Sequence, residues 1–322
     1  MTAAPRIILH NDNTEILERM LAKAVPEAVV KTCQNYSGLP DLIERFDPDV
    51  VYSIRFAGTP EFPSSALFGQ KGPRWLAIGG AGTDHLGQWD PKVTTVTNAA
   101  GVAADMMAEY VFGGLLQFTL DLPGLQADKS ARVWKARQMV PLKEKTLLII
   151  GLGHTGRAIA HRAQAFGMTV LGTRARPQQM DNVDEVYAAE ELMALLPRAD
   201  FIAVCCPLLP STKGIIGAGQ IAAMRPGVVI ADVSRGGVID QTELVVGLRN
   251  GPIKSAVLDV FETEPLPADN PLWSMENVII SPHCSSVYDG WEEASFSLFL
   301  ENLNRWTGGV ALRNVVDPAL GY

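Results

Sequence analysis

The stretch IIGLGHTGRAIAHRAQAFG, Ile149 to Gly167, decides the fold of this 322-residue chain. It places a G-x-G-x-x-G pattern directly after an apolar run and directly before a helical pattern. Such glycines permit a tight turn, close approach of a pyrophosphate, and close packing of helix on strand. The start of the helix then offers free N–H groups to phosphates. We interpret the stretch as a dinucleotide-binding turn, whose predicted contacts are Gly151, Leu152, Gly153, His154, Thr155 and Gly156.

Strand-like runs alternate with helical patterns along nearly the whole chain, which predicts βαβ units and parallel sheets. Before residue 99 the apolar runs are 6–10, 28–33, 49–56, 74–82 and 94–98. After Pro141 six more runs fit one doubly wound sheet, at 146–152, 168–174, 200–206, 227–233, 254–261 and 277–282. A long helical pattern begins near Gly101 and should end or kink at Pro123, and a final helix is expected over 290–306.

The predicted fold class is therefore α/β, with two Rossmann-like or flavodoxin-like domains and a cleft between them. We expect a dinucleotide-binding domain at 100–284. A discontinuous substrate-binding domain of the flavodoxin-like type should comprise 1–99 and 285–322.

Composition and charge exclude several classes of protein. A net charge of −8 and a pI near 5.2 argue against a nucleic-acid partner, because phosphate contacts need a basic face. No run reaches the ~18 uncharged apolar residues that a membrane span needs, and the first residues do not read as a signal peptide. The four cysteines form no CxxC pair, which favours free thiols in the cytoplasm.

The second strand of the nucleotide domain bears on cofactor choice. NAD sites usually place an acid about 20 residues after the glycines, where it binds the ribose 2′-hydroxyl. This chain reads LGTRARPQQ over 171–179, with Thr173, Arg174 and Arg176 and no acid before Asp181. Two guanidinium groups can hold a 2′-phosphate that a carboxylate would repel. We therefore predict NADPH as the preferred cofactor, with NADH possible; solvated surface arginines are the alternative interpretation.

Four further stretches carry a family resemblance. In chain order they are GGAGTDHL (79–86), ADVSRGGVID (231–240), AVLDVFETEPLP (256–267) and VIISPHCSS (278–286). Together with the glycine turn they resemble the D-isomer-specific 2-hydroxyacid dehydrogenase family over essentially the whole chain. The arginines after the second strand and the TEPLP segment are similar to the glyoxylate/hydroxypyruvate reductase branch. The resemblance implies NAD(P)-dependent hydride transfer between a nicotinamide and a small 2-oxo or 2-hydroxy acid.

Arg235, Glu264 and His283 are the predicted catalytic residues. Arg235 follows a strand at its carboxyl end, where ligands bind in open α/β sheets, and its guanidinium can hold both the carboxylate and the keto oxygen of a 2-oxo acid. Glu264 and His283 follow the next two strands and should meet. A carboxylate against one imidazole nitrogen favours the protonated ring, which prepares His283 as general acid and, in reverse, as general base.

The resemblance also implies a wider set of contacts. On the cofactor side these are Cys206, Pro207, Thr212, Val233, Ser234, Arg235, Asp259, His283 and Ser285. On the substrate side they are Arg55, Ala81, Gly82, Arg235 and Trp134. Trp134 matches a tryptophan that reaches the site of a neighbouring subunit in glyoxylate reductases, and plain packing is the alternative interpretation. The chain departs from the family at Ser285–Ser286, where Gly-Gly is frequent. A homodimer through the helix near 101–121 is implied as well. No His/Cys/Asp cluster has metal-ligand spacing.

Other functions remain open at this stage. The same fold and residue triad occur in C-terminal-binding-protein corepressors, which sense nucleotides and bind peptides, but the chain lacks the extra tails of that role. Formate dehydrogenases place Gln where this chain has Glu264. A short phosphoglycerate dehydrogenase stays possible, whereas a D-lactate enzyme would more typically show the acid of an NAD site. The sequence does not fix the preferred 2-oxo acid.

Overall fold

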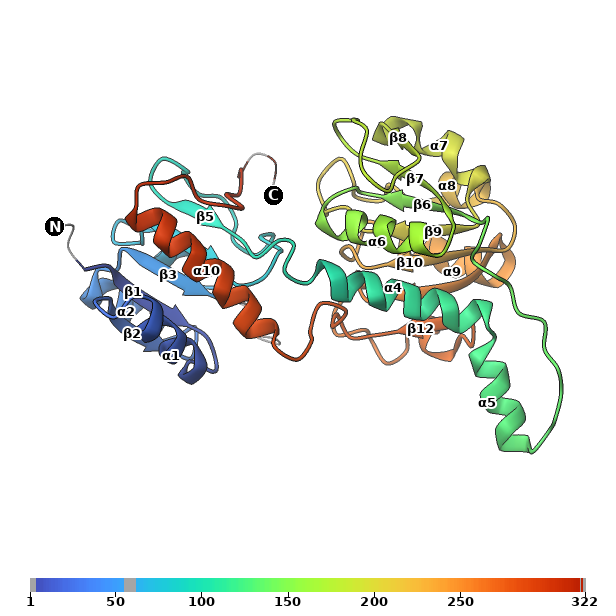
Figure 1. The fold of residues 1–322 in the computed structure, drawn as a ribbon, viewed down its shortest axis with the longest axis horizontal. Helices are drawn as coiled ribbons and strands as arrows, with labels where there is room; N and C mark the ends of the chain where they lie inside the picture. The colour runs from blue at the N-terminus through green and yellow to red at the C-terminus, as the bar shows by residue number, and fades with distance from the viewer. Residues whose placement is uncertain (1–3, 55–61, 319, 321–322) are drawn as a thin grey trace. The chain divides into compact units, whose positions relative to one another are not determined.

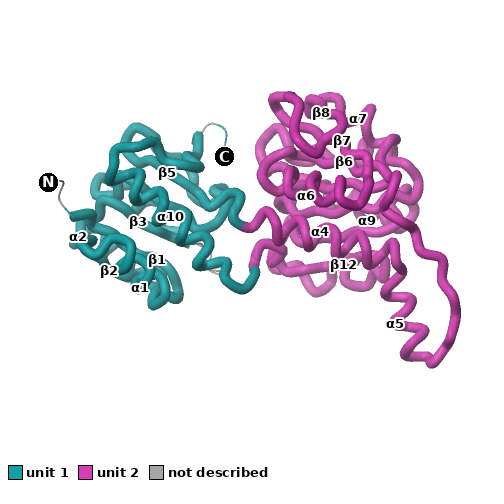
Figure 2. Tube along the Cα trace, in the orientation of Figure 1, with its two compact units in different colours: residues 1–102, 288–322 teal, residues 103–287 magenta. Residues whose placement is uncertain are grey.

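The computed structural model describes residues 4–54, 62–318 and 320. The chain divides into two compact units, one of residues 1–102 with 288–322 and one of residues 103–287 (Figure 2). Each unit is built on one sheet in which all strands run parallel, so the predicted α/β class is confirmed (Figure 1).

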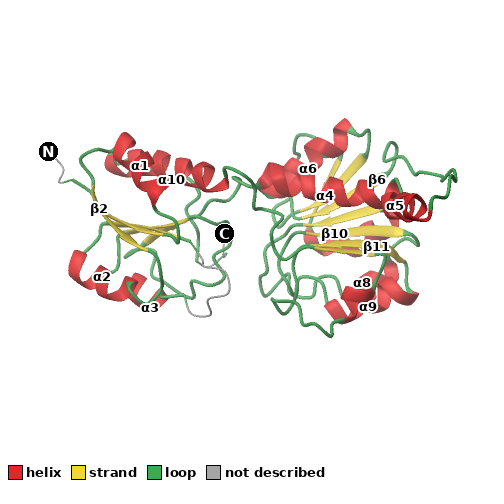
Figure 3. Ribbon diagram, turned by 90° about the horizontal axis from the view of Figure 1, so that it is seen from below, coloured by secondary structure: helices red, strands yellow, loops and turns green. Residues whose placement is uncertain are grey.

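The first unit holds a five-stranded sheet in the order β2-β1-β3-β4-β5, which is the flavodoxin-like order. Ile7 and Leu9 of β1 face one layer and Ile8 faces the other, because side chains alternate along a strand. Helices α1 and α10 cover the first face, and α2 and α3 cover the second (Figure 3). The bounds are β1 Arg6–His10, α1 Glu15–Ala24, β2 Val29–Cys33, α2 Leu39–Phe46, β3 Val50–Ser53, α3 Ser64–Leu67, β4 Trp75–Ile78, β5 Thr95–Thr97 and α10 Trp291–Thr307.

The second unit holds a seven-stranded sheet in the order β12-β11-β10-β9-β6-β7-β8. The chain leaves β6 for β7 on one side and later returns to β9 on the other side, so the direction of strand order reverses between β6 and β9. The bounds are α4 Ala104–Thr119, α5 Leu122–Ala131, β6 Thr146–Ile150, α6 His154–Ala165, β7 Thr169–Thr173, β8 Glu185–Tyr187, α7 Leu192–Leu195, β9 Phe201–Val204, α8 Ala218–Ala223, β10 Val228–Asp232, α9 Gln241–Asn250, β11 Ile253–Leu258 and β12 Val278–Ile280.

Two apolar layers enclose this sheet. Helices α4 and α6 cover one face, and α8 and α9 cover the other (Figure 3). Leu147 and Ile149 of β6 belong to the first layer, and Leu148 and Ile150 belong to the second. Burial on both faces explains why these strands read as continuous apolar runs rather than as alternating ones.

Three details differ from the sequence expectation. The sheet has a seventh strand, the three-residue β8, which the polar sequence around Glu185 did not indicate. Strand β9 ends at Val204, so Cys205 and Cys206 lie just beyond it. The helical pattern from Gly101 breaks into α4 and α5 before Pro123, which occupies the first turn of α5, where its missing N–H is tolerated.

Candidate active site

The glycine turn joins β6 to α6 at the point where strand order reverses. Gly151 has a φ of +102°, and a Cβ there would lie 2.7 Å from the backbone nitrogen of Cys206. A Cβ on Gly156 would lie 2.1 Å from the carbonyl oxygen of Gly151, whereas one on Gly153 would meet open space. Helix α6 starts at His154 without a side-chain cap, so its first turn can offer N–H groups to an anion. The turn therefore has the shape and the donors that a pyrophosphate requires.

Cationic residues follow β7 and lie in the first turn of α6. Arg174 is half-buried at the end of β7 and Arg176 is exposed. His154 is exposed, and its Nδ1 lies 3.2 Å from Nη2 of Arg157, a basic residue that the sequence interpretation did not include. Thr173 is buried, and its carbonyl accepts the N–H groups of Gly151 and Leu152 at 3.1 Å each. The strand end thus anchors the turn through its backbone, while Nη1 of Arg174 lies 3.2 Å from the sulfur of Met180.

The loop after β9 presents the adenosine-side residues. Cys206 is buried, and Pro207 is exposed. The hydroxyl of Thr212 donates to the carbonyl of Pro207 at 2.6 Å and accepts the N–H of Leu209 at 2.8 Å. This hydroxyl is engaged within its own turn, so it shapes the loop.

Arg235 lies on a turn after β10 that two glycines make possible. Gly237 has a φ of +89°, and a Cβ on Gly236 would lie 1.8 Å from the carbonyl oxygen of Phe261. The turn therefore lies directly against the loop that follows β11. Arg235 is half-buried, and its Nη1 donates to the Ser234 carbonyl at 2.8 Å.

The structure brings Glu264 and His283 into contact. Nδ1 of the imidazole lies 2.8 Å from Oε2 of the carboxylate, and each side chain is 36% exposed. Partial burial acts to raise the pKa of Glu264, but the hydrogen bonds from His283 and from the Phe261 N–H, together with the charges of His283 and Arg235, bring that pKa below its ordinary value. The carboxylate is therefore charged at neutral pH and can orient the ring so that Nε2 remains for a substrate.

Asp259 organises the loop that carries His283. Its carboxylate accepts the hydroxyls of Ser281 and Ser285 at 2.5 Å each and the N–H of Cys284 at 2.8 Å, and it is 2% exposed. Its carbonyl accepts the N–H of His283 at 2.9 Å. These bonds hold the backbone of His283 at a φ of +51°, a left-handed conformation that residues other than glycine rarely adopt. Both Asp259 and Ser285, predicted as cofactor contacts, thus use their side chains within the protein.

The network continues into helix α4. The hydroxyl of Tyr110 lies 2.5 Å from that of Ser281, and burial raises the pKa of Tyr110 to about 12. A second buried acid, Asp232, accepts the N–H of Ser234 at 3.0 Å and also its hydroxyl. Sequence reasoning missed Tyr110, Ser281 and Asp232. The available signal was position, because Asp232 ends β10, Asp259 follows β11 and Ser281 follows β12.

The remaining predicted residues are spread over both units of the chain. Val233 is buried beside Ser234. Ala81 and Gly82 lie in the first unit after β4, where the Ala81 carbonyl accepts the side-chain amide of Asn98 at 2.8 Å. Trp134 is fully exposed on the segment after α5. Arg55 lies outside the described residues.

The residues that the structure describes also bear on metal binding and on membrane insertion. Among those residues, no group of three or more His, Cys, Asp or Glu side chains could hold a metal ion. Within the same residues, every helix is too short or too polar to traverse a bilayer.

Comparison with protein families identifies the region around this site. Residues 112–285 match the model of the D-isomer-specific 2-hydroxyacid dehydrogenase NAD-binding domain, which is more than half of the chain. The chain belongs to this family. The matched region includes the glycine turn, Arg235, Glu264 and His283, so the 2-hydroxyacid dehydrogenase resemblance seen in the sequence is confirmed.

Individual relatives cover most of the chain. A D-3-phosphoglycerate dehydrogenase of Methanocaldococcus jannaschii is 32% identical over 96% of this chain, and the chain spans 58% of that enzyme's length. A glyoxylate reductase of Korarchaeum cryptofilum is 32% identical over 69% of this chain and 69% of its own length.

Two solved structures share the full architecture. A D-isomer-specific 2-hydroxyacid dehydrogenase family protein from Aeromonas salmonicida superposes with a TM-score of 0.84 at 31% identity, covering 98% of this chain and 99% of its own. An NADPH-dependent glyoxylate/hydroxypyruvate reductase from Sinorhizobium meliloti, in complex with NADP and sulfate, gives 0.82 at 25% identity, covering 99% and 100%.

Proposed function

We propose that the chain is an NADPH-preferring reductase of small 2-oxo acids, such as glyoxylate and hydroxypyruvate, to D-2-hydroxy acids. The observation that carries the proposal is the Glu264–His283 pair, 2.8 Å apart, on the loops that follow β11 and β12. Strand β11 lies between β12 and β10, the strand that leads to Arg235. All three residues lie at the same edge of the sheet as the glycine turn. The family membership and the glyoxylate reductase among the relatives support the same chemistry.

Each residue has a role that its surroundings allow. Arg235 binds the substrate carboxylate and stabilises the charge that grows on the keto oxygen. When bound, NADPH supplies a hydride to the carbonyl carbon. His283 gives a proton from Nε2 to the keto oxygen, which completes the hydroxyl group. Glu264 holds the ring by Nδ1 and thereby orients Nε2 toward the substrate.

The cofactor fits the turn that would hold it. At Gly151 and Gly156 a Cβ would collide with nearby backbone atoms, so only glycine permits this tight turn. Helix α6 begins at the turn without a side-chain cap. Arg174 and Arg176 would bind the 2′-phosphate, which supports NADPH over NADH. The S. meliloti reductase, described as NADPH-dependent, is consistent with this preference.

The proposal includes a homodimer in the cytoplasm, formed through α4, which is the helix expected near 101–121. Leu122, Val133 and Trp134 are exposed at the two ends of α5, so this segment also offers apolar side chains to a second copy. In such a dimer Trp134 would reach the site of the partner. Ala81 and Gly82, together with Arg55, are proposed to contact the substrate carboxylate. All four cysteines are free thiols, which fits a reducing compartment.

Replacing His283 with Gln tests the chemical role. We expect the rate of NADPH oxidation with glyoxylate to fall by roughly 10²- to 10⁴-fold, the usual contribution of a positioned acid–base group. NADPH binding, followed by fluorescence titration, should change little. His161→Gln, at an exposed histidine on α6, is the matched control and should retain full activity. Equal loss of binding and rate in His283→Gln would indicate a structural histidine instead.

The substrate itself is settled by a panel of 2-oxo acids, each assayed with NADPH and with NADH. Activity confined to a phosphorylated acid would favour the phosphoglycerate dehydrogenase relative, with which the chain shares 32% identity. Absence of turnover with every 2-oxo acid would overturn the reductase proposal.

A further inference from the structure

A pocket of about 250 Å³ lies at the edge of the second unit's sheet opposite to the candidate active site. Four neighbouring strands, β11, β10, β9 and β6, begin beside it, whereas their far ends carry Asp259, Asp232, Cys206 and Gly151. The pocket is therefore distinct from the cofactor turn and from the Glu264–His283 pair.

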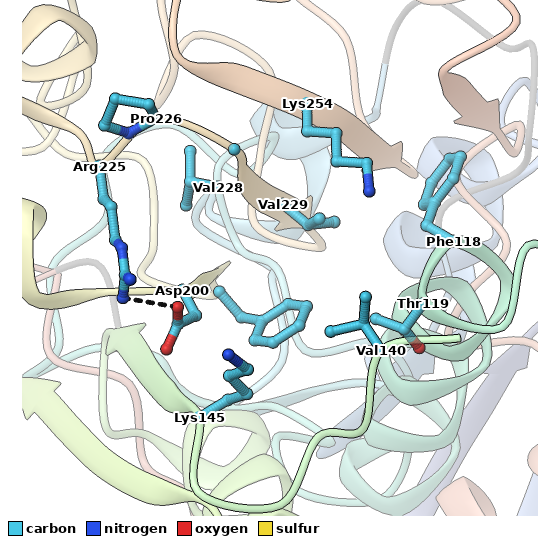
Figure 4. Close-up of a pocket in the computed structure, with 12 residues that line it drawn as sticks. Phe118, Thr119, Val140, Lys145, Asp200, Arg225, Pro226, Val228, Val229 and Lys254 are labelled. Atoms are coloured by element: carbon cyan, nitrogen blue, oxygen red, sulfur yellow. Dashed lines mark hydrogen bonds and ion pairs between the residues drawn. The ribbon is translucent and has the colours of Figure 1, made fainter. Parts of the chain in front are cut away.

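Three cationic side chains line this pocket. Lys145 and Lys254 extend their ammonium groups into it from opposite sides, while Arg225 is held by Asp200 at 2.7 Å (Figure 4). The other carboxylate oxygen of Asp200 accepts the N–H of Thr146 at 3.0 Å. Asp200, the single acidic residue of the lining, therefore already binds Arg225 and the Thr146 N–H through its two carboxylate oxygens.

The two lysines lack an anionic partner within the described part of the chain, since no ion pair joins either of them to a carboxylate there. Two ammonium groups that face one cavity repel each other. An anion bound between them attracts both groups, and this attraction offsets the repulsion. The charge of the pocket thus favours a ligand that carries two negative charges.

Apart from Thr119, the other side chains of the lining are apolar. Phe118, Val140 and Val229 form walls beside the lysines (Figure 4). Phe201 also lines the pocket. Since a water molecule occupies about 30 Å³ of liquid, the volume equals roughly eight waters. That space suits a molecule of a few carbon atoms better than a bare inorganic ion, because burying carbon atoms against apolar walls is favourable in free energy.

We propose that this pocket binds a small organic dianion, with a dicarboxylate or phosphate head on a short carbon body. Lys145 and Lys254 bind the charged groups, and the phenylalanine and valine side chains contact the carbon body. The inference is independent of the proposed reductase activity, because it concerns the opposite edge of the sheet and is tested by binding alone.

The experiment uses isothermal titration of the full chain with succinate, with glycerol 3-phosphate and with inorganic phosphate as the bare ion. We expect at least one of the two organic probes to bind more tightly than inorganic phosphate. The Lys145→Gln/Lys254→Gln double variant should lose about tenfold or more in affinity, which is what removal of two weak ion pairs gives. Comparing succinate with glycerol 3-phosphate identifies the head group.

Two controls make the result decisive. The Lys145→Arg/Lys254→Arg variant keeps both charges and should retain binding, and its folding shows that the lining tolerates change. Lys143→Gln removes a lysine that is 76% exposed just outside the pocket and should leave the affinity unaltered. Binding that survives in the double Gln variant would assign the anion to another site and overturn the proposal, as would failure of both organic probes to bind the parent chain.

Discussion

Asp232 gives the sharpest prediction about stability and pH. The residue is 4% exposed. Burial raises the pKa of its carboxyl from 3.8 to about 7, although hydrogen bonds from the Ser234 hydroxyl and N–H act in the opposite direction. Asn has the shape of the protonated acid and keeps the oxygen that Ser234 contacts. Asp232→Asn therefore removes the titration while retaining the local contacts.

The sign and size follow from proton linkage. The folded chain keeps this proton to higher pH than the unfolded chain, so the parent protein loses stability as the pH rises from about 4 to about 7. At one pKa unit per 1.36 kcal/mol, the whole effect reaches about 4 kcal/mol at pH 8. Between pH 5 and pH 8 the stability of Asp232→Asn relative to the parent should therefore increase by about 3 kcal/mol.

The assay is urea unfolding of both proteins at pH 5, 6, 7 and 8, followed by tryptophan fluorescence. Comparison at each pH cancels the titrations that the two proteins share. Asp41→Asn, at a carboxyl that is 77% exposed, is the control and should show no such trend. A difference between Asp232→Asn and the parent that stays constant, or shrinks as the pH rises, would refute a protonated Asp232 in the fold.

Three further outcomes are expected. Replacing Arg174 and Arg176 with Ala should raise the Michaelis constant for NADPH by about tenfold or more and change that for NADH far less; parallel changes would mean that neither arginine binds the 2′-phosphate. Ser285→Ala removes a hydrogen bond to the buried carboxylate of Asp259 and should cost about 1.5–3 kcal/mol in urea unfolding, whereas Cys284→Ala, whose backbone N–H keeps its bond, should not. Gly236→Ala would place a methyl 1.8 Å from a carbonyl oxygen and should lower the thermal midpoint by several degrees, unlike Gly219→Ala, which meets open space.

The contact between Glu264 and His283 could be predicted from position along the strands. Glu264 and His283 follow β11 and β12, and parallel strands end at the same edge, so their 2.8 Å contact could be expected from the chain alone. The role of Asp259 could not be predicted from the sequence. Its two carboxylate oxygens are engaged by a loop more than twenty residues away, and the geometry of that loop depends on packing.

The sequence by itself determined the two parallel sheets, the glycine turn and the chemistry of the strand ends. These features depend on local rules, namely apolar runs, glycine φ angles and the common direction of parallel strands. Only the tertiary structure decided that Asp232 is buried enough to hold a proton, that Ser285 supports the loop of His283, and that Lys145 and Lys254 face one pocket. Each of these depends on residues distant in the chain, whose contacts arise from the packing of several elements together.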